Sequence, residues 1–262
     1  MFYWIYDIPL HQLALWMALA FVGFSWAGVL LIRPVMRLVV LRRRGDTNSV
    51  IGSILSCYCV FYGLLLGLIA VAAYQNFSEV DANVSREAAA LAALYEDVSH
   101  YREPEGQNLR WLLRDFCRYT IQDAWPKYQR GELPDGAETR LRAFHERLLS
   151  FHPESTMEEV VHQEAIRQFN SFLEQHRVRE HSVTTGIPAV MWYVVLIGAV
   201  LNIALVWLFD MDLLSHLVLG GILAFFLGTV IFLIAAMDNP FRGEVSIQPE
   251  AFETLYRTRM RQ

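Results

Sequence analysis

Four long segments without a charged side chain restrict what this chain can fold into. They cover residues 10–32, 51–74, 188–209 and 216–237, and none of them contains Asp, Glu, Lys or Arg. A helix rises about 1.5 Å per residue, so each segment is long enough to cross a hydrocarbon core of about 30 Å. Lipid offers no hydrogen-bond partner to the backbone, so a helix is the structure expected for each. The sequence therefore predicts a polytopic membrane protein with four transmembrane helices.

The composition excludes several other classes of protein. Hydrophobic residues make up 54% of the 262 residues and charged residues only 19%, which is not the composition of a disordered chain. The net charge of −5 provides no basic field for a nucleic-acid partner. Three cysteines do not make a disulfide framework. The first apolar segment is expected to be a retained span, because no Lys or Arg precedes it and it is longer than a signal-peptide core.

The charged residues are concentrated between the second and third apolar segments. Residues 75–187 hold 19 of the 27 acidic and 13 of the 22 basic side chains, a net charge of 13 − 19 = −6. We therefore expect this insert to be the main domain outside the bilayer. The predicted organisation is an interfacial N-terminal tail at 1–9, a first transmembrane helix pair at 10–74, an extramembrane helical bundle at 75–187, a second pair at 188–237 and a C-terminal tail at 238–262.

The insert has helical periodicity throughout and no strand pattern. Apolar residues spaced three and four apart carry the second transmembrane helix on to about Ser99. Further helices are predicted at 107–125, where Pro126 ends the pattern, at 136–151, and from a capping box of Ser155 and Glu158 to about Thr184. The apolar stripe of the last helix contains Val161, Ala165, Phe169, Phe172 and His176. The predicted fold class is all-α, with an antiparallel bundle inserted between the second and third spans.

No pattern in the sequence indicates catalysis. Glu159 and His162 form one Glu-x-x-His motif, but a carboxylate-bridged metal site needs a second motif of this kind, and the sequence has none. A solvated helix face is the favoured interpretation. Phosphate-binding glycine loops, nucleophile elbows and Cys-x-x-Cys pairs are also missing from the sequence. We therefore expect no enzyme, no catalytic residue, no cofactor and no metal.

Small residues in the apolar segments indicate helix packing. Gly63 and Gly67 form a Gly-x-x-x-Gly motif, which allows two helix backbones to approach closely in lipid. The favoured interpretation is packing of the four spans within one subunit, and the alternatives are contact between subunits and a pore lining. Glycines in the first and fourth spans add to this surface: Gly23, Gly28, Gly220, Gly221 and Gly228. Polar residues that follow the second span, including Gln75, Asn76 and Glu79, fit either interfacial solvation or a functional mouth.

Several stretches resemble a bacterial four-span family described as bestrophin-like. They are YGLLLGLIAVAAYQNFSEVDANVSREAAALAALY, DAWPKYQRGELP, IPAVMWYVVLIGA and AAMDNPFRGEVSIQPEAF. The combination of Glu87-Ala-Ala with Asp238-Asn-Pro-Phe-Arg-Gly is typical of that family. The resemblance implies a multi-pass protein of the bacterial inner membrane and, more distantly, the architecture of bestrophins.

Bestrophins are pentameric anion channels whose second span lines the pore with a hydrophobic neck. Carried over to this chain, the pore-lining candidates are Val60, Leu64, Gly67, Leu68, Val71 and Gln75. The candidates for a pore mouth or exit turn are Asn76, Glu79, Asp238, Asn239, Pro240 and Phe241. Arg242-Gly243-Glu244 stands where an acidic calcium-binding run would follow, so calcium gating is not implied. The predicted partners are the lipid bilayer, further copies of the chain and an anion such as chloride.

Two function classes and two orientations remain open. The first class is an oligomeric ion channel for anions, and the second is a membrane-anchored sensor or scaffold without transport activity whose bundle binds a partner. Five arginines in 33–52 favour a cytoplasmic position for that connection and an outside position for the bundle. The resemblance to bestrophins implies the opposite, with the bundle and both termini in the cytoplasm.

Overall fold

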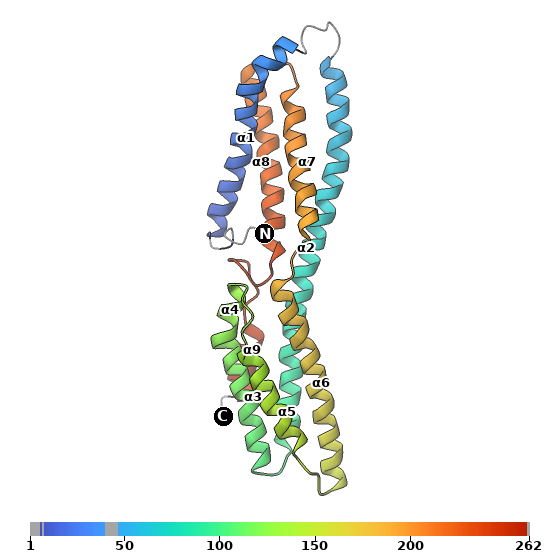
Figure 1. Ribbon diagram of the computed structural model, residues 1–262, viewed down its shortest axis with the longest axis vertical. Coiled ribbons are helices and arrows are strands. Elements are labelled where there is room, and N and C mark those ends of the chain that lie inside the picture. Colours follow the sequence, from blue (N-terminus) through green and yellow to red (C-terminus); the bar gives the residue numbers. More distant parts are fainter. Residues whose placement is uncertain (1–5, 7, 40–46, 261–262) are drawn as a thin grey trace. The chain divides into compact units, whose positions relative to one another are not determined.

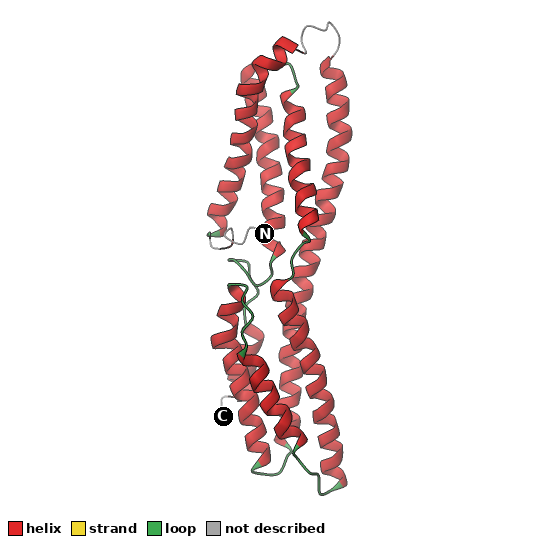
Figure 2. Cartoon of the chain, in the orientation of Figure 1, coloured by secondary structure: helices red, strands yellow, loops and turns green. Residues whose placement is uncertain are grey.

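The computed structural model of the chain describes residues 6, 8–39 and 47–260, with only the backbone for 33–39 and 47. Within these ranges every regular element is helical and no strand occurs (Figure 2). The predicted all-α fold class is therefore confirmed. Most of the predicted N-terminal tail, residues 1–9, and the arginines at 42–44 lie outside the described residues.

Four helices contain the four apolar segments. They are α1 (Leu10–Val39), α2 (Thr47–Ser99), α7 (Ala189–Trp207) and α8 (Leu213–Asp238), and each is long and apolar enough to cross a membrane. Helix α2 is continuous over 53 residues, as its apolar spacing predicted. The apolar part of this helix is 51–74, and we treat only that part as membrane-spanning.

A first compact unit comprises Met1–Gln75 and Ile187–Asp238. In it α1 and α8 lie side by side, with α7 next to them (Figure 1). Two tyrosines of α2 hold it to α7, because Tyr58 and Tyr62 donate to the carbonyls of Gly198 and Val195 at 2.8 and 2.7 Å. These hydroxyls add a second hydrogen bond to carbonyls of a helix in an apolar environment.

Small residues allow close approach among these helices. A Cβ atom at Gly28 of α1 would lie 1.9 Å from the ring of Trp207, and one at Gly228 of α8 would lie 3.3 Å from the backbone of Ala18. Gly220 and Gly221 of α8 likewise face side chains of α1. The predicted small-residue packing surface is therefore present at these four glycines.

A second compact unit comprises Asn76–Gly186 and Asn239–Gln262. Besides the C-terminal half of α2, it contains α3 (Glu105–Tyr119), α4 (Trp125–Gln129), α5 (Gly136–Leu149), α6 (Thr156–Thr184) and α9 (Glu250–Leu255). π-helical turns occupy Thr120–Ala124 and Tyr256–Met260. The core is rich in aromatic side chains, including Phe116, Trp125, Phe144, Phe169 and Phe172.

One helix start in this unit has the capping signal that the sequence predicts. The side chain of Ser155 accepts a hydrogen bond from the backbone N–H of Glu158 at 3.2 Å, so the predicted N-cap of α6 is confirmed. The Glu158 carboxylate bonds to the N–H of Glu154 at 2.7 Å, one residue before the expected partner. The prediction that a helix ends at Pro126 was wrong. Pro126 lies in the first turn of α4, directly after the π-helical turn, and the backbone stays helical from Tyr119 through Trp125.

The C-terminal segment, predicted as a tail at 238–262, belongs to the second unit from Asn239 onward. Phe241, Ile247, Phe252, Leu255 and Met260 belong to the hydrophobic core of that unit. The indole N–H of Trp125 donates to the carbonyl of Ile247 at 3.0 Å. Short polar stretches separate these apolar residues, so the segment has no continuous helical period from which their burial could be predicted.

Candidate functional site

The pore-lining candidates share the exposed face of α2. Val60, Leu64, Leu68 and Val71 are 69%, 61%, 62% and 53% exposed in the single chain. Gly67 and Gln75 are exposed as well. Tyr62, Leu66 and Ile69 on the opposite face are buried in the core of the first unit. The helix therefore presents a long apolar surface that no other described part of this chain covers.

The Gly-x-x-x-Gly motif lies on the same uncovered side. A Cβ atom added at Gly63 or Gly67 would meet no atom within 4 Å. These glycines do not pack against another described helix of the chain, so the favoured within-subunit interpretation is wrong for Gly63 and Gly67. Trp207 and Tyr62 instead occupy the close approaches at Gly28 and Gly198. Contact between copies and a pore lining remain as roles for Gly63 and Gly67.

The residues proposed for a mouth or exit turn have unequal surroundings. Glu79 is exposed and Asn76 is half-buried. Asp238 is buried and accepts hydrogen bonds from the backbone N–H of Ile187 at 2.5 Å and from the indole of Trp192 at 3.1 Å. This carboxylate therefore fixes the segment that enters α7 to the end of α8.

The turn after α8 is built from the other members of this set. The Asn239 carbonyl accepts from the N–H of Arg242 at 3.0 Å, and the Pro240 carbonyl accepts from the N–H of Ile247 at 2.8 Å. The ring of Phe241 is buried, with its centroid 5.7 Å from that of Trp125. These contacts give the turn a structural role in the second unit.

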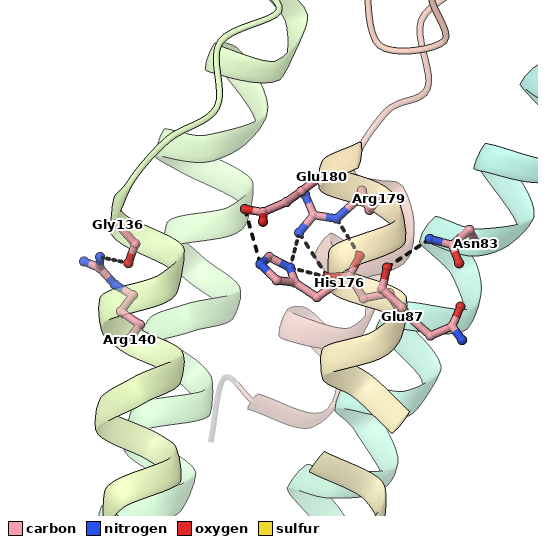
Figure 3. Close-up of polar contacts among 8 residues, drawn as sticks. Asn83, Glu87, Gly136, Arg140, His176, Arg179 and Glu180 are labelled. Carbon is pink, nitrogen blue, oxygen red and sulfur yellow. Dashed lines mark hydrogen bonds and ion pairs between the residues drawn. The ribbon is translucent and has the colours of Figure 1, made fainter. Parts of the chain in front are cut away.

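A buried polar cluster links α2 to α6 in the second unit (Figure 3). Glu87 of α2 and Arg179 of α6 are both 0% exposed, and the guanidinium holds both carboxylate oxygens at 2.5 and 3.0 Å. His176 contacts Glu87 through Nδ1 at 2.9 Å and Glu180 through Nε2 at 3.4 Å. The amide of Asn83 donates to the carbonyl of Gln175 at 3.1 Å.

Aromatic rings surround the guanidinium of Arg179. Its central carbon lies 4.9 Å from the ring centroid of Tyr128, 5.4 Å from that of Trp125 and 5.6 Å from that of Phe252. Such rings stabilise a desolvated cation through their quadrupoles. One buried ion pair therefore connects α2, α4, α6 and α9.

The charges in this cluster shift the pKa of the carboxyl group. Burial alone would raise the pKa of Glu87, but the charge of Arg179 and the hydrogen bonds from His176 and Arg179 outweigh it, so the pKa lies below its ordinary value. The carboxylate is therefore ionised at neutral pH.

The Glu-x-x-His motif has ordinary structural surroundings. Nδ1 of His162 lies 2.7 Å from the hydroxyl of Tyr101, and burial lowers the pKa of this imidazole. Among residues 6, 8–39 and 47–260, no group of three or more His, Cys, Asp or Glu side chains has an arrangement that holds a metal ion.

The buried cluster was not predicted, although the sequence contains a signal for it. Val84, Glu87 and Leu91 continue one stripe of α2 at spacings of three and four. On α6, His176, Arg179 and Val183 do the same. A charged residue in an apolar register on each of two helices, with opposite signs, indicates a buried pair.

Comparisons with known proteins agree with this architecture. A family model described as the Bestrophin-like domain matches residues 19–252. The fold is similar to that in the crystal structure of a bacterial bestrophin homologue from Klebsiella pneumoniae that carries one mutation. The TM-score is 0.68 at 11% identity, over 92% of this chain and 96% of that one.

The crystal structure of a membrane protein that carries one mutation is similar too, with a TM-score of 0.66 at 12% identity over 93% of this chain and 96% of that one. A search of curated proteins finds none that matches. At these identities the solved structures show the fold alone, whereas the family model covers most of the sequence. The chain belongs to the Bestrophin-like family of membrane proteins.

Proposed function

We propose that this protein is an oligomeric ion channel that conducts anions such as chloride. The observation that carries the proposal is the uncovered apolar face of α2, on which Val60, Leu64, Leu68 and Val71 are all more than half exposed. Membership of the Bestrophin-like family supports the same conclusion, because bestrophins use their second span in this way.

The proposed conduction pathway is a hydrophobic neck. Several copies of α2 around a symmetry axis would place Leu64 and its neighbours in a ring around the axis. An apolar constriction of this kind controls permeation through the free-energy cost of wetting and needs no ring of charges. Gly63 and Gly67 would then allow close approach between α2 and a neighbouring copy. A pentamer is the assembly implied by analogy with bestrophins.

The experiment that tests this function combines assembly with flux. The purified chain is sized in mild detergent by light scattering, reconstituted into liposomes and assayed for release of trapped chloride. We expect a discrete oligomer and chloride release above that of protein-free liposomes. A folded monomer without flux would contradict the channel and favour the membrane-anchored sensor or scaffold.

The proposed location is the bacterial inner membrane, with the charged bundle at 75–187 on one side of it. The side is decided by accessibility labelling of a cysteine at Leu133, which is 51% exposed in the loop before α5. Labelling from the cytoplasm would agree with the bestrophin orientation. Labelling from outside would agree with the arginine-rich connection at 33–52 being cytoplasmic.

A further inference from the structure

His176 lies between two carboxylates and a guanidinium, and its two ring nitrogens contact different partners (Figure 3). Nδ1 lies 2.9 Å from Oε1 of Glu87 and 3.1 Å from Nη2 of Arg179. Nε2 lies 3.4 Å from Oε1 of Glu180, one helical turn along α6. The side chain is 3% exposed, so water replaces few of these contacts.

The two partners of Nδ1 require opposite protonation states. A guanidinium only donates hydrogen bonds and an ionised carboxylate only accepts them. Nδ1 therefore bonds to Arg179 when it carries no proton and to Glu87 when it does. Nε2 faces the Glu180 carboxylate alone, so it holds a proton in both states. The neutral ring thus accepts from Arg179 and donates to Glu180, whereas the imidazolium donates to both carboxylates.

Solvent reaches the imidazole through a surface groove of about 420 Å³ between α5 and α6. His176 and Glu180 line it from α6, and His145 lines it from α5. The Glu180 side chain is 32% exposed. The imidazole therefore lines a solvent-connected groove of the folded bundle, so its protonation can change without unfolding.

The remaining charges near the cluster leave Glu87 and Glu180 dominant. On α5, Glu138 and Arg142 pair with each other at 2.9 Å. On α3 the ring of Phe116 packs against the imidazole at 5.5 Å between centroids, and the buried Cys117 thiol is neutral, because burial raises its pKa to about 12. The described charged and titratable groups that contact the cluster or line the groove beside it are Glu87 on α2, Cys117 on α3, Tyr128 on α4, Glu138, Arg142 and His145 on α5, and Arg177, Arg179 and Glu180 on α6.

We propose that His176 is a proton-operated switch that sets how tightly α2 is held to α6 in the bundle. With a proton on each ring nitrogen, the imidazolium connects Glu87 of α2 to Glu180 of α6. When Nδ1 loses its proton, this link opens and Nδ1 accepts from Arg179 instead, while the Glu87–Arg179 ion pair remains. The inference rests on the second unit alone and does not depend on the proposed channel.

The electrostatics place the pKa of His176, and with it the pH at which this switch operates, above the ordinary value for histidine. Burial by itself lowers the pKa of His176, but the hydrogen bonds to Glu180 and Glu87 exceed that effect and raise it above 6.5. A group whose pKa is raised by folding stabilises the protein fully below its unfolded pKa. That stabilisation is lost as the pH rises through the folded value. The α2–α6 attachment is thus strongest in mild acid and weaker in alkali.

The test measures the unfolding temperature of the full-length chain in detergent from about pH 5 to about pH 9. We expect the wild type to lose stability in a step above pH 6.5 and His176→Gln to lack that step. Glu180→Gln removes one charge facing Nε2 and should move the step to lower pH, with roughly tenfold weaker proton affinity. His145→Gln is the matched control, because His145 lines the same groove and stacks on Phe169 at 5.0 Å, with no carboxylate partner among the described residues.

The variants separate this switch from titration elsewhere in the chain. A step that persists in His176→Gln, or that disappears in His145→Gln, would overturn the proposal. If His176→Gln does not fold, Glu180→Gln decides the matter, because Glu180 is partly exposed and glutamine keeps a hydrogen-bond acceptor there. A step that stays at the wild-type pH in Glu180→Gln would also overturn it.

Discussion

Arg179 and Glu87 form an ion pair that solvent does not reach, with both side chains 0% exposed and Nε of Arg179 2.5 Å from Oε2 of Glu87. The two residues are 92 positions apart in the chain, so their contact fixes α6 against α2. Removing two charges from water is costly unless each has a partner and further hydrogen bonds. Here His176 supplies the carboxylate with an additional contact at 2.9 Å. His176 therefore offsets part of this cost, and loss of either charged partner would leave the other buried without its counter-charge.

The first prediction concerns loss of one partner. Glu87→Gln leaves the Arg179 cation buried without its counter-charge, which is expected to cost about 3–5 kcal/mol. The unfolding temperature of the purified protein should fall accordingly. The control is Glu164→Gln, because that carboxylate pairs with Arg167 at the surface and solvent replaces the contact. Equal unfolding temperatures for Glu87→Gln and the wild type would refute the structural importance of the pair.

The second prediction concerns acid. The pKa of Glu87 is lower in the folded chain than its ordinary value of 4.5, so its stabilising contribution is complete above that value. It is lost as the pH falls through the folded pKa, when the carboxylate takes up a proton. We expect tertiary structure, followed by near-ultraviolet circular dichroism, to be lost below pH 4.5 in the wild type. Glu87→Gln should lose less stability than the wild type over the same interval, and identical acid dependence would contradict this account.

The transmembrane helices could be predicted from the sequence because lipid leaves a helix as the only outcome for an uncharged segment of this length. The register of α6 was predictable as well, since Ala165, Phe169, Phe172 and His176 are all buried as their spacing indicates. The burial of Phe252 and Met260 was not predictable, because the helices that contain them are too short for a periodic pattern.

The candidate site was likewise only partly predictable from the sequence. That Val60, Leu64 and Val71 share one face of α2 follows from their spacing, whereas a pore-lining role for that face was implied only by the resemblance to bestrophins. Whether Gly67 packs within the chain depends on which neighbours reach it, and no local pattern contains that information. The pairing of Glu87 with Arg179 likewise depends on the register between two helices that are distant in sequence.

The third prediction tests close packing in the first unit. A methyl group at Gly28 would lie 1.9 Å from the ring of Trp207, whose indole also donates to the carbonyl of Ser25 at 3.0 Å. Gly28→Ala should therefore force α1 and α7 apart and cost about 1–3 kcal/mol. Gly23→Ala is the matched control, because a methyl group there meets no atom within 4 Å. Equal unfolding temperatures for the two variants would show that this packing is not as described.

The fourth prediction concerns assembly. A Cβ atom at Gly67 meets no described atom of the same chain within 4 Å, so the folded subunit should tolerate leucine there. If α2 packs against another copy at this point, Gly67→Leu should sharply reduce the oligomer in mild detergent while the helical content is unchanged. Gly23→Leu, on α1, should assemble like the wild type. Full assembly of Gly67→Leu would show that this face of α2 is not part of the interface between copies.

The central claim is that α2 lines an anion pathway, and chloride flux through Leu64→Ser tests it most directly. Leu64 is 61% exposed. With Leu64→Ser, each subunit would place a serine around the axis, which would lower the free-energy cost of wetting the neck. Leu219→Ser on α8, where the leucine is 57% exposed, is the matched control. In proteoliposomes the account predicts faster chloride release from Leu64→Ser than from the wild type, and wild-type rates from Leu219→Ser. Folded, assembled wild-type and Leu64→Ser proteins that both release no chloride would contradict it.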